Sequence, residues 1–262
     1  QTCALPISLF LYKKIFKYLI SYKMLKKCCA EFLGTFLLCY VGCGAAVLNS
    51  SVPITGPLIF VFLIVGLGSG FGHISGAHLN PSVSLAFLLI KQMKMKEFGF
   101  YIVSQFLGAL SGFFCLYQLL SSLNGTVTDL ACNGYGELSP SKISVFNAFF
   151  FEFFITCFFV YVILTNCKKE YAPFIIAFTL GSIAFFAGGL TGGSMNPVRS
   201  LAPAIIMGGV ALRQAWLFVF APLLGAAAAS FLFKFFNCNC KKLEKSDKDD
   251  KDTELVELNN KD

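Results

Sequence analysis

Long apolar stretches alternate with short polar connections along most of the chain. A helix needs about 20 mainly apolar residues to cross the hydrocarbon core of a bilayer. Two shorter apolar pieces, at 80–90 and 196–207, are too short to cross. Six stretches are long enough, at residues 28–48, 57–75, 97–120, 145–167, 172–190 and 211–236. The pattern predicts an all-α membrane protein with six transmembrane helices and two re-entrant half-helices.

The two short pieces divide the chain into similar halves. In the first half, a span that carries Glu31 is followed by a short piece beginning at Asn80, and Glu152 and Asn196 repeat this order in the second half. Each half holds three spans, and this odd number places the second half upside down in the membrane. Inverted repeats put the functional site near the midplane, between the halves.

Charged residues are few and unevenly placed. They make up 13% of the chain, against about 25% in soluble domains. Lysines lie mainly on one side of the predicted spans, in residues 13–27, 91–96, 168–169 and 241–261. Because basic residues concentrate in cytoplasmic connections, we expect both termini to be cytoplasmic, in a multi-pass protein of the plasma membrane or an internal membrane. The net charge of +7 therefore does not indicate nucleic acid as a partner; the lipid bilayer is the expected one.

Each short piece begins with Asn-Pro, at Asn80–Pro81 and Asn196–Pro197. Asn caps the free N–H groups of a helix start, and Pro suits the first helical position. We therefore expect two half-helices that meet N-terminus to N-terminus at mid-membrane. Each N-terminus carries about half a positive charge, which raises the barrier to cations. A lone Asn-Pro is usually a turn, but two, each after small residues and before an apolar helix, favour half-helices.

Glu31 and Glu152 are the only acidic residues well inside the predicted spans. Intramembrane carboxylates are costly and usually functional or structural. They could couple transport to protons, or they could accept hydrogen bonds from the backbone of the re-entrant loops. Their symmetry and the lack of a basic partner favour the second interpretation. For His73 and His78, beside the first loop, we expect hydrogen bonds that hold the loop rather than pH sensing.

Arg199 lies three residues after Asn196, where the first half has Val83. The repeat therefore does not require a basic residue at this position. A snorkelling arginine is a weak explanation because the flanking residues are small. An arginine that lines a constriction would repel cations and donate hydrogen bonds to neutral solutes.

The two loops resemble the signature loops of the aquaporin, or major intrinsic protein, family. The matching segments are His73-Ile-Ser-Gly-Ala-His-Leu-Asn-Pro-Ser-Val83 and Gly192-Gly-Ser-Met-Asn-Pro-Val-Arg-Ser-Leu201. Most members have Ala where this chain has Ser82 and Val198, a mild change that also resembles some plant nodulin-26-like channels, a branch that passes metalloid hydroxides. The third connection, Asn133-Gly-Tyr-Gly-Glu-Leu-Ser-Pro140, is similar to the water-selective aquaporin Z branch.

This resemblance implies a right-handed bundle, a homotetramer with one pore per subunit, and a four-residue selectivity filter at Phe60, Ala184, Gly193 and Arg199. Water-selective relatives tend to have Phe, His, Thr or Cys, and Arg at these positions. Ala184 and Gly193 are therefore both smaller than the residues that water-selective relatives tend to have at these two positions. Glycerol facilitators have an Asp after the Arg, where this chain has Ser200. The chain as a whole resembles a water channel, with a filter wider than usual.

We therefore expect a passive channel for water that excludes protons and ions, with small neutral solutes such as glycerol, urea and ammonia as further candidates. The alternative is a proton-coupled secondary transporter that uses Glu31 and Glu152. The sequence has no nucleophile–base set for an enzyme and no cysteine or histidine cluster for a metal or other cofactor. Several of its 11 cysteines fall in apolar runs, where a thiol behaves as a small hydrophobe.

We place the channel domain at 24–236, with repeat one at 24–120 and repeat two at 145–236. Residues 1–23 are expected to form an N-terminal extension that need not be native, since Met24 would make a natural start. Residues 237–262 mix Lys with Asp and Glu, and such a segment is expected to be a disordered cytoplasmic tail.

The predicted topology can be checked by glycosylation. Asn124-Gly-Thr126 and Asn49-Ser-Ser51 are acceptor sequons on the side assigned as extracellular. In a eukaryotic cell we expect a glycan at Asn124 or Asn49, detected as an endoglycosidase-sensitive gel shift. A sequon inserted near Lys169 is the control and should stay bare. Glycan at that inserted site would show that the topology is inverted.

Overall fold

The structure is a computed structural model that describes the backbone of residues 5–52 and 54–259, and the side chains of 21–52, 54–123 and 125–237. All regular structure in these residues is helical. The elements are α1 (Leu5–Leu37), the π-helical η1 (Leu38–Cys43), α2 (Gly44–Leu48), α3 (Thr55–Ser75), α4 (Pro81–Leu89), α5 (Met95–Asn124), the 3₁₀ turn η2 (Gly136–Leu138), α6 (Val145–Asn166), α7 (Ala172–Ala187), α8 (Pro197–Met207) and α9 (Gly209–Asn259).

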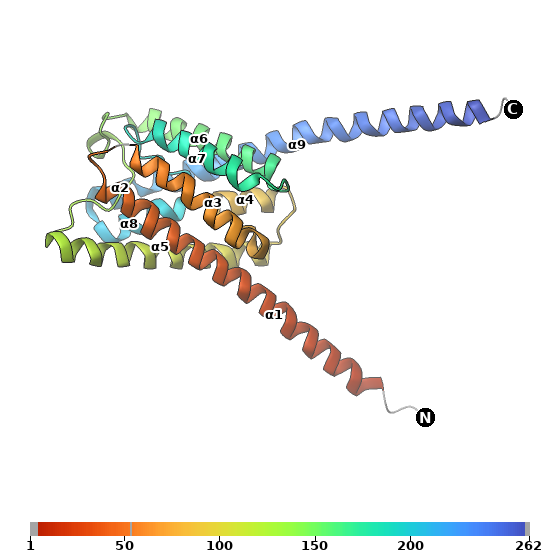
Figure 1. Cartoon of the computed structure of the whole chain (residues 1–262), viewed down its shortest axis with the longest axis horizontal. Coiled ribbons are helices and arrows are strands. Elements are labelled where there is room, and N and C mark those ends of the chain that lie inside the picture. The colour runs from red at the N-terminus through yellow and green to blue at the C-terminus, as the bar shows by residue number, and fades with distance from the viewer. Residues whose placement is uncertain (1–4, 53, 260–262) are drawn as a thin grey trace.

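Six long helical segments form the bundle, and two short helices complete it (Figure 1). The bundle consists of α1 continued by η1 and α2, with α3, α5, α6, α7 and α9. The short helices are α4, with 9 residues, and α8, with 11. At about 1.5 Å per residue, neither can cross a hydrocarbon core of about 30 Å. The predicted fold class, six spans with two re-entrant half-helices, is confirmed.

The fifth predicted span is shorter than the others. Five helical segments in the described part of the chain are long and apolar enough to cross a membrane, whereas α7 has only 16 residues. A helix of that length extends about 24 Å. The prediction extended the span to residue 190, but the helix ends at Ala187 and a turn through Gly188 and Gly189 follows. α7 packs along α3, which has 21 residues and is the longer of the two helices.

Glycines bring paired helices into close contact at equivalent places in the two halves. A Cβ added to Gly108 of α5 would lie 2.3 Å from the carbonyl oxygen of Phe32 in α1. A Cβ added to Gly225 of α9 would lie 2.5 Å from the carbonyl oxygen of Phe153 in α6. Small residues at such contacts allow backbones to approach closely, which drives helix association in membranes. The same close glycine contact therefore joins the first and the last long helix of each half, α1 to α5 and α6 to α9.

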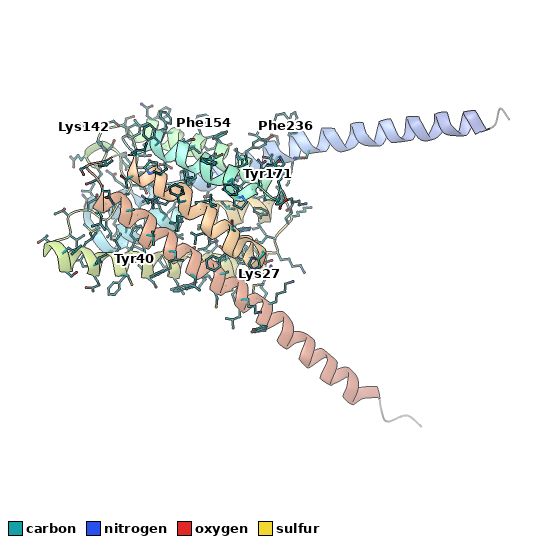
Figure 2. The ribbon with its side chains drawn as sticks, viewed as in Figure 1. Lys27, Tyr40, Lys142, Phe154, Tyr171 and Phe236 are labelled. Carbon is teal, nitrogen blue, oxygen red and sulfur yellow. The ribbon has the colours of Figure 1, made fainter. Side chains whose placement is uncertain are left out.

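The outer surface of the bundle is apolar. Large side chains such as Phe154, Phe178 and Phe231 are more than half exposed, and Figure 2 shows Phe154 at the edge of the bundle. An apolar exterior of this extent is unusual for a soluble monomer and fits a bilayer.

The first part of α1 and the last part of α9 project from the same end of the bundle (Figure 1). Lys27, Tyr171 and Phe236 lie at this end, whereas Lys142 lies at the opposite end (Figure 2). The predicted disordered tail is instead continuous with α9, which remains helical to Asn259. The physical reason is its content of good helix formers, including Lys, Glu and Leu, and the lack of Gly or Pro between residues 238 and 259.

Candidate functional site

The two half-helices begin beside one another inside the bundle. The Nδ2 of Asn80 donates to the carbonyl oxygen of Met195 at 2.8 Å, and the Nδ2 of Asn196 donates to the carbonyl oxygen of Leu79 at 2.9 Å. These reciprocal bonds join the two halves of the repeat. A carboxamide has two N–H donors, so each asparagine keeps one for another molecule.

Each asparagine also caps its own half-helix. The Oδ1 of Asn80 accepts from the backbone N–H of Ser82 at 2.8 Å, and the Oδ1 of Asn196 accepts from that of Arg199 at 3.4 Å. A proline follows each asparagine at the first helical position. The remaining N–H groups of the two helix starts concentrate partial positive charge where the halves meet.

The loops that lead into these helices have strained backbones. Ala77, Leu79 and Met195 have φ angles of 47°, 51° and 50°. This left-handed conformation costs a residue with a Cβ about 1–2 kcal/mol. Leu79 and Met195 are the residues directly before the two asparagines. Other contacts must therefore stabilise both loops at the same point of the repeat.

Glu31 holds the first loop. Its carboxylate is fully buried and accepts from the backbone N–H groups of His78 and Leu79, at 2.9 and 2.7 Å. It also accepts from Ser75 Oγ at 2.7 Å and Gln105 Nε2 at 2.8 Å. All four partners are donors, which suits an ionised carboxylate because it only accepts.

Glu152 holds the second loop in the same way. It too is fully buried, and it accepts from the backbone N–H groups of Ser194 and Met195 at 2.9 and 3.1 Å. Thr191 Oγ1 donates to it at 2.6 Å. Each carboxylate therefore satisfies the N–H of the left-handed residue that precedes its asparagine.

Because the N–H groups of the loops donate to the carboxylates, the carbonyl oxygens of the same loops remain available as hydrogen-bond acceptors. Among the described residues, no donor reaches the carbonyl oxygens of 76–78 or of 192–194. All six residues line one cavity. The two loops thus offer a row of acceptors and, between them, two asparagine donors.

This cavity has a volume of about 520 Å³ and lies between the loops and the long helices. One end is lined by Lys168, Lys169 and Glu170 of the α6–α7 connection, and the other reaches Arg199. The wall opposite the loops is apolar and includes Ile64, Leu67, Phe159, Ile163, Ile176 and Leu180. A polar strip that faces an apolar wall suits molecules that hydrogen-bond in single file.

The structure brings all four predicted filter residues to this cavity. Phe60, Ala184, Gly193 and Arg199 line it together with both asparagines. A Cβ added to Gly42 would lie 2.7 Å from the ring of Phe60, so this glycine leaves room for the aromatic wall. Ala184 contributes one methyl group, and Gly193 contributes backbone alone.

No aromatic side chain of α7 fills the space beside Ala184. The neighbouring Phe185 and Phe186 are 63% and 64% exposed, and neither lines the cavity. Phe186 instead packs edge to face on Phe151, with ring centroids 5.4 Å apart. The reduced bulk of the filter is therefore not compensated from this helix.

Of the two histidines expected to hold the first loop by hydrogen bonds, His78 does so and His73 does not. His73, in the last turn of α3, is exposed and lines the cavity, and among the described residues its ring makes no hydrogen bond. The histidine that supports the loop is His78, whose Nδ1 lies 3.1 Å from Ser84 Oγ and whose ring stacks on Phe87. The helix turn directs His73 toward the cavity rather than toward the loop.

Ser82 and Val198, which follow the prolines, are buried and do not line the cavity. Arg199 is also buried, and its Nη1 donates to the carbonyl oxygen of Ala131 and to Asn133 Oδ1, at 2.7 and 2.6 Å. The sequence pattern assigns no role to Asn133, although its segment resembles that of the aquaporin Z branch. Within the described residues, no group of His, Cys, Asp or Glu could hold a metal ion.

Comparisons with known proteins agree with this geometry. The family model of the major intrinsic proteins matches residues 18–233. The chain is 35% identical to aquaporin Z of Rhodopseudomonas palustris over 217 residues, which cover 78% of this chain and 90% of that protein. It is 36% identical to aquaporin Z of Brucella melitensis over 222 residues, which cover 80% and 97%. The X-ray structure of the aquaglyceroporin from Plasmodium falciparum is similar in fold, with a TM-score of 0.72, 25% identity, and coverage of 84% of this chain and 99% of that chain.

The inverted repeat, the apolar exterior and the internal cavity between two re-entrant loops define an integral, multi-pass membrane protein. The chain belongs to the major intrinsic protein family.

The support that the carboxylates give the loops can be tested by substitution. Glu152→Gln places an amide donor against backbone N–H groups. Since a buried unsatisfied donor costs about 1–3 kcal/mol, we expect a lower thermal unfolding temperature in detergent and a smaller folded yield. Glu31→Gln should behave alike because its contacts are equivalent, whereas Glu137→Gln is the control, since Glu137 is exposed. Unchanged stability in both buried variants would contradict this role.

Proposed function

We propose that this protein is a passive channel that conducts water and excludes protons and ions. The observation that carries the proposal is the pair of half-helix N-termini, where Asn80 and Asn196 each keep one free N–H beside the cavity. Membership of the major intrinsic protein family supports it, and so does the likeness to two proteins named aquaporin Z.

The geometry suggests how water would pass while protons are excluded. A water molecule between the asparagines would accept a hydrogen bond from each amide, so its own hydrogens would point away along the pore, toward the loop carbonyls. That orientation interrupts a continuous chain of hydrogen-bonded donors. The partial positive charge of both helix starts raises the barrier further for any cation. An ion would also lose hydration against the apolar wall, which cannot replace it.

The proton-coupled transporter finds less support. Such a mechanism would use Glu31 and Glu152 as proton carriers. Both carboxylates instead accept hydrogen bonds from the backbone of the loops and are fully buried. Among the described residues no basic side chain forms an ion pair with either one. We therefore assign them to loop support.

We further propose that the filter admits neutral solutes larger than water, such as glycerol or urea. Ala184 and Gly193 are small, while Phe60 and Arg199 remain as an apolar wall and a donor on the same cavity. Pore diameter and lining set selectivity of this kind. The first part of α1 and the last part of α9 lie at one end of the bundle, and we place that end in the cytoplasm because the lysines gather there. A homotetramer with one pore per subunit is the assembly that the family resemblance implies.

Water conduction without protons is tested in liposomes with purified protein. Stopped-flow light scattering should show osmotic water flux several-fold above protein-free vesicles, and a trapped pH dye should report no matching proton flux. Asn80→Asp should lower selectivity or folded yield because it removes an amide donor from the midpoint. Asn147→Asp is the control, since Asn147 is exposed on α6. Proton flux comparable with water flux in the wild type would overturn the proposal.

The wide filter is tested by restoring bulk at Ala184. Ala184→His should lower glycerol and urea permeability about tenfold or more, as expected for steric discrimination in a pocket, with a smaller effect on water. Phe185→Leu on the outer face of α7 is the matched control. A substitution at Gly193 is less clean, because its φ is 60° and a Cβ there would lie 2.9 Å from that of Ala187. If the wild type already excludes both solutes as fully as Ala184→His does, the filter is narrow.

A further inference from the structure

The first long helix changes its winding beside the filter. Residues Leu38–Cys43 form the π-helix η1, and the residues on both sides of it keep helical backbone angles, so the helix runs on without a break. A π turn holds one more residue than an α turn and is frequent at functional sites. The equivalent helix of the second half, α6, is α-helical from Val145 to Asn166. Of these two equivalent helices, only the one that contacts Phe60 changes its winding.

Gly42 of η1 is buried and faces the ring of Phe60 in α3. A Cβ at Gly42 would lie 2.7 Å from Cε1, 2.9 Å from Cζ and 3.2 Å from Cδ1 of this ring. Carbon atoms in contact prefer about 3.5–4.0 Å, so either the helix or the ring would have to move. The ring is the end of a side chain, whereas η1 belongs to a packed helix, and the ring is therefore the part that would give way.

Space, and not backbone conformation, explains why glycine stands at this position. Gly42 lies within a continuous helix and is not one of the glycines with a positive φ. Alanine is the better helix former of the two residues, so helix propensity alone would favour it. What glycine provides here is a recess, the volume beside Gly42 that the edge of the Phe60 ring occupies.

The ring of Phe60 connects this recess to the passage. Phe60 lines the cavity, whereas Gly42 does not. The ring also packs against two buried apolar clusters, which include Cys43 and Leu67. A ring pushed away from η1 would therefore meet packed side chains on its flanks and open volume toward the cavity.

The second half shows a different packing at the equivalent place. Ile163 is the counterpart of Gly42, since each lies eleven residues after the buried glutamate of its half and follows a Tyr-Val pair. Ile176 is the counterpart of Phe60, since each lies twenty residues before the asparagine of its half. Both isoleucines line the cavity and belong to one apolar cluster. Where the helix carries a branched side chain, the neighbouring wall thus has an aliphatic residue, and the aromatic ring stands opposite the glycine.

We propose that Gly42 is a positioning residue that sets the width of the filter, because its recess holds the ring of Phe60 against η1 and out of the passage. A larger residue at this position would move the aromatic wall inward and narrow the opening that the small residues Ala184 and Gly193 leave. Gly42 itself touches no solute and acts through Phe60. This inference rests on the proposed channel function and on its wide filter.

The test measures glycerol-to-water and urea-to-water permeability ratios in proteoliposomes of the full-length protein. Gly42→Ala should lower both ratios about threefold or more, because one methyl group in a close-fitting pocket changes discrimination about tenfold and here it acts through the ring. Phe60→Leu shortens the wall, so adding Gly42→Ala to Phe60→Leu should leave the ratios of the single Phe60→Leu variant unchanged. If Gly42→Ala does not fold, the same methyl group is added on a Phe60→Met background, whose adaptable side chain is long enough to be displaced, and both ratios should again fall.

Gly44→Ala is the matched control. Gly44 is also buried, two residues further along the same continuous helix, and a Cβ there would lie 3.1 Å from the side chain of Leu116. Because Leu116 does not line the cavity, the ratios of this variant should stay at the wild-type value even where its thermal stability falls.

The inference is overturned if the folded variant with the added methyl group keeps the ratios of its parent, or if Gly44→Ala lowers them equally. It is also overturned if Gly42→Ala lowers the ratios as much on the Phe60→Leu background as in the wild type, because the methyl group would then act on something other than the ring. Failure of the proposed function is a separate outcome. A wild type without water flux above protein-free vesicles refutes the channel, a wild type that carries water but neither solute refutes the wide filter, and the inference falls with either.

Discussion

A buried carboxylate bound to the backbone of a strained loop is the interaction on which the rest of the structure depends. Glu31 and Glu152 each satisfy two consecutive loop N–H groups, including that of the left-handed residue before the Asn-Pro pair. Without such an acceptor, the loop would combine backbone strain with unsatisfied donors in an apolar environment, at several kcal/mol for each unpaired group. The carboxylate removes the N–H groups from the cavity and leaves the carbonyl oxygens to line it. One interaction therefore sets both the path of the loop and the polarity of the passage.

The two loops are stabilised together rather than separately. Asn80 and Asn196 each donate to the other half, so neither half-helix start has its final environment until both are in place. The close glycine contacts at Gly108 and Gly225 allow the helices around them to approach. The passage is thus a property of the folded pair of repeats, and it depends on packing at a distance from the cavity.

The halves are equivalent where they hold the loops and differ where they face the solute. Arg199 has Val83 as its counterpart, and its acceptors come from the third connection, which lies between the repeats. The symmetric part of the structure therefore positions the two asparagines at the midpoint, while the asymmetric third connection positions Arg199 at one end of the cavity. The amide of Asn133 links the two, because it contacts both the second loop and the arginine.

The sequence by itself predicted the apolar spans, the inverted order of the two halves and the half-helices, because apolar length and Asn-Pro caps are local properties. The filter residues follow only from the resemblance of the loops to a known family, and their role stays a prediction. The tertiary structure decided the rest. It separated the roles of His73 and His78, ended α7 at Ala187 and continued α9 as a helix through the charged tail. It alone revealed Asn133 as a partner of Arg199, since that contact joins residues far apart in the chain. Sequence spacing within a helix or loop predicts which groups are present, but hydrogen bonds between distant segments depend on how the helices pack.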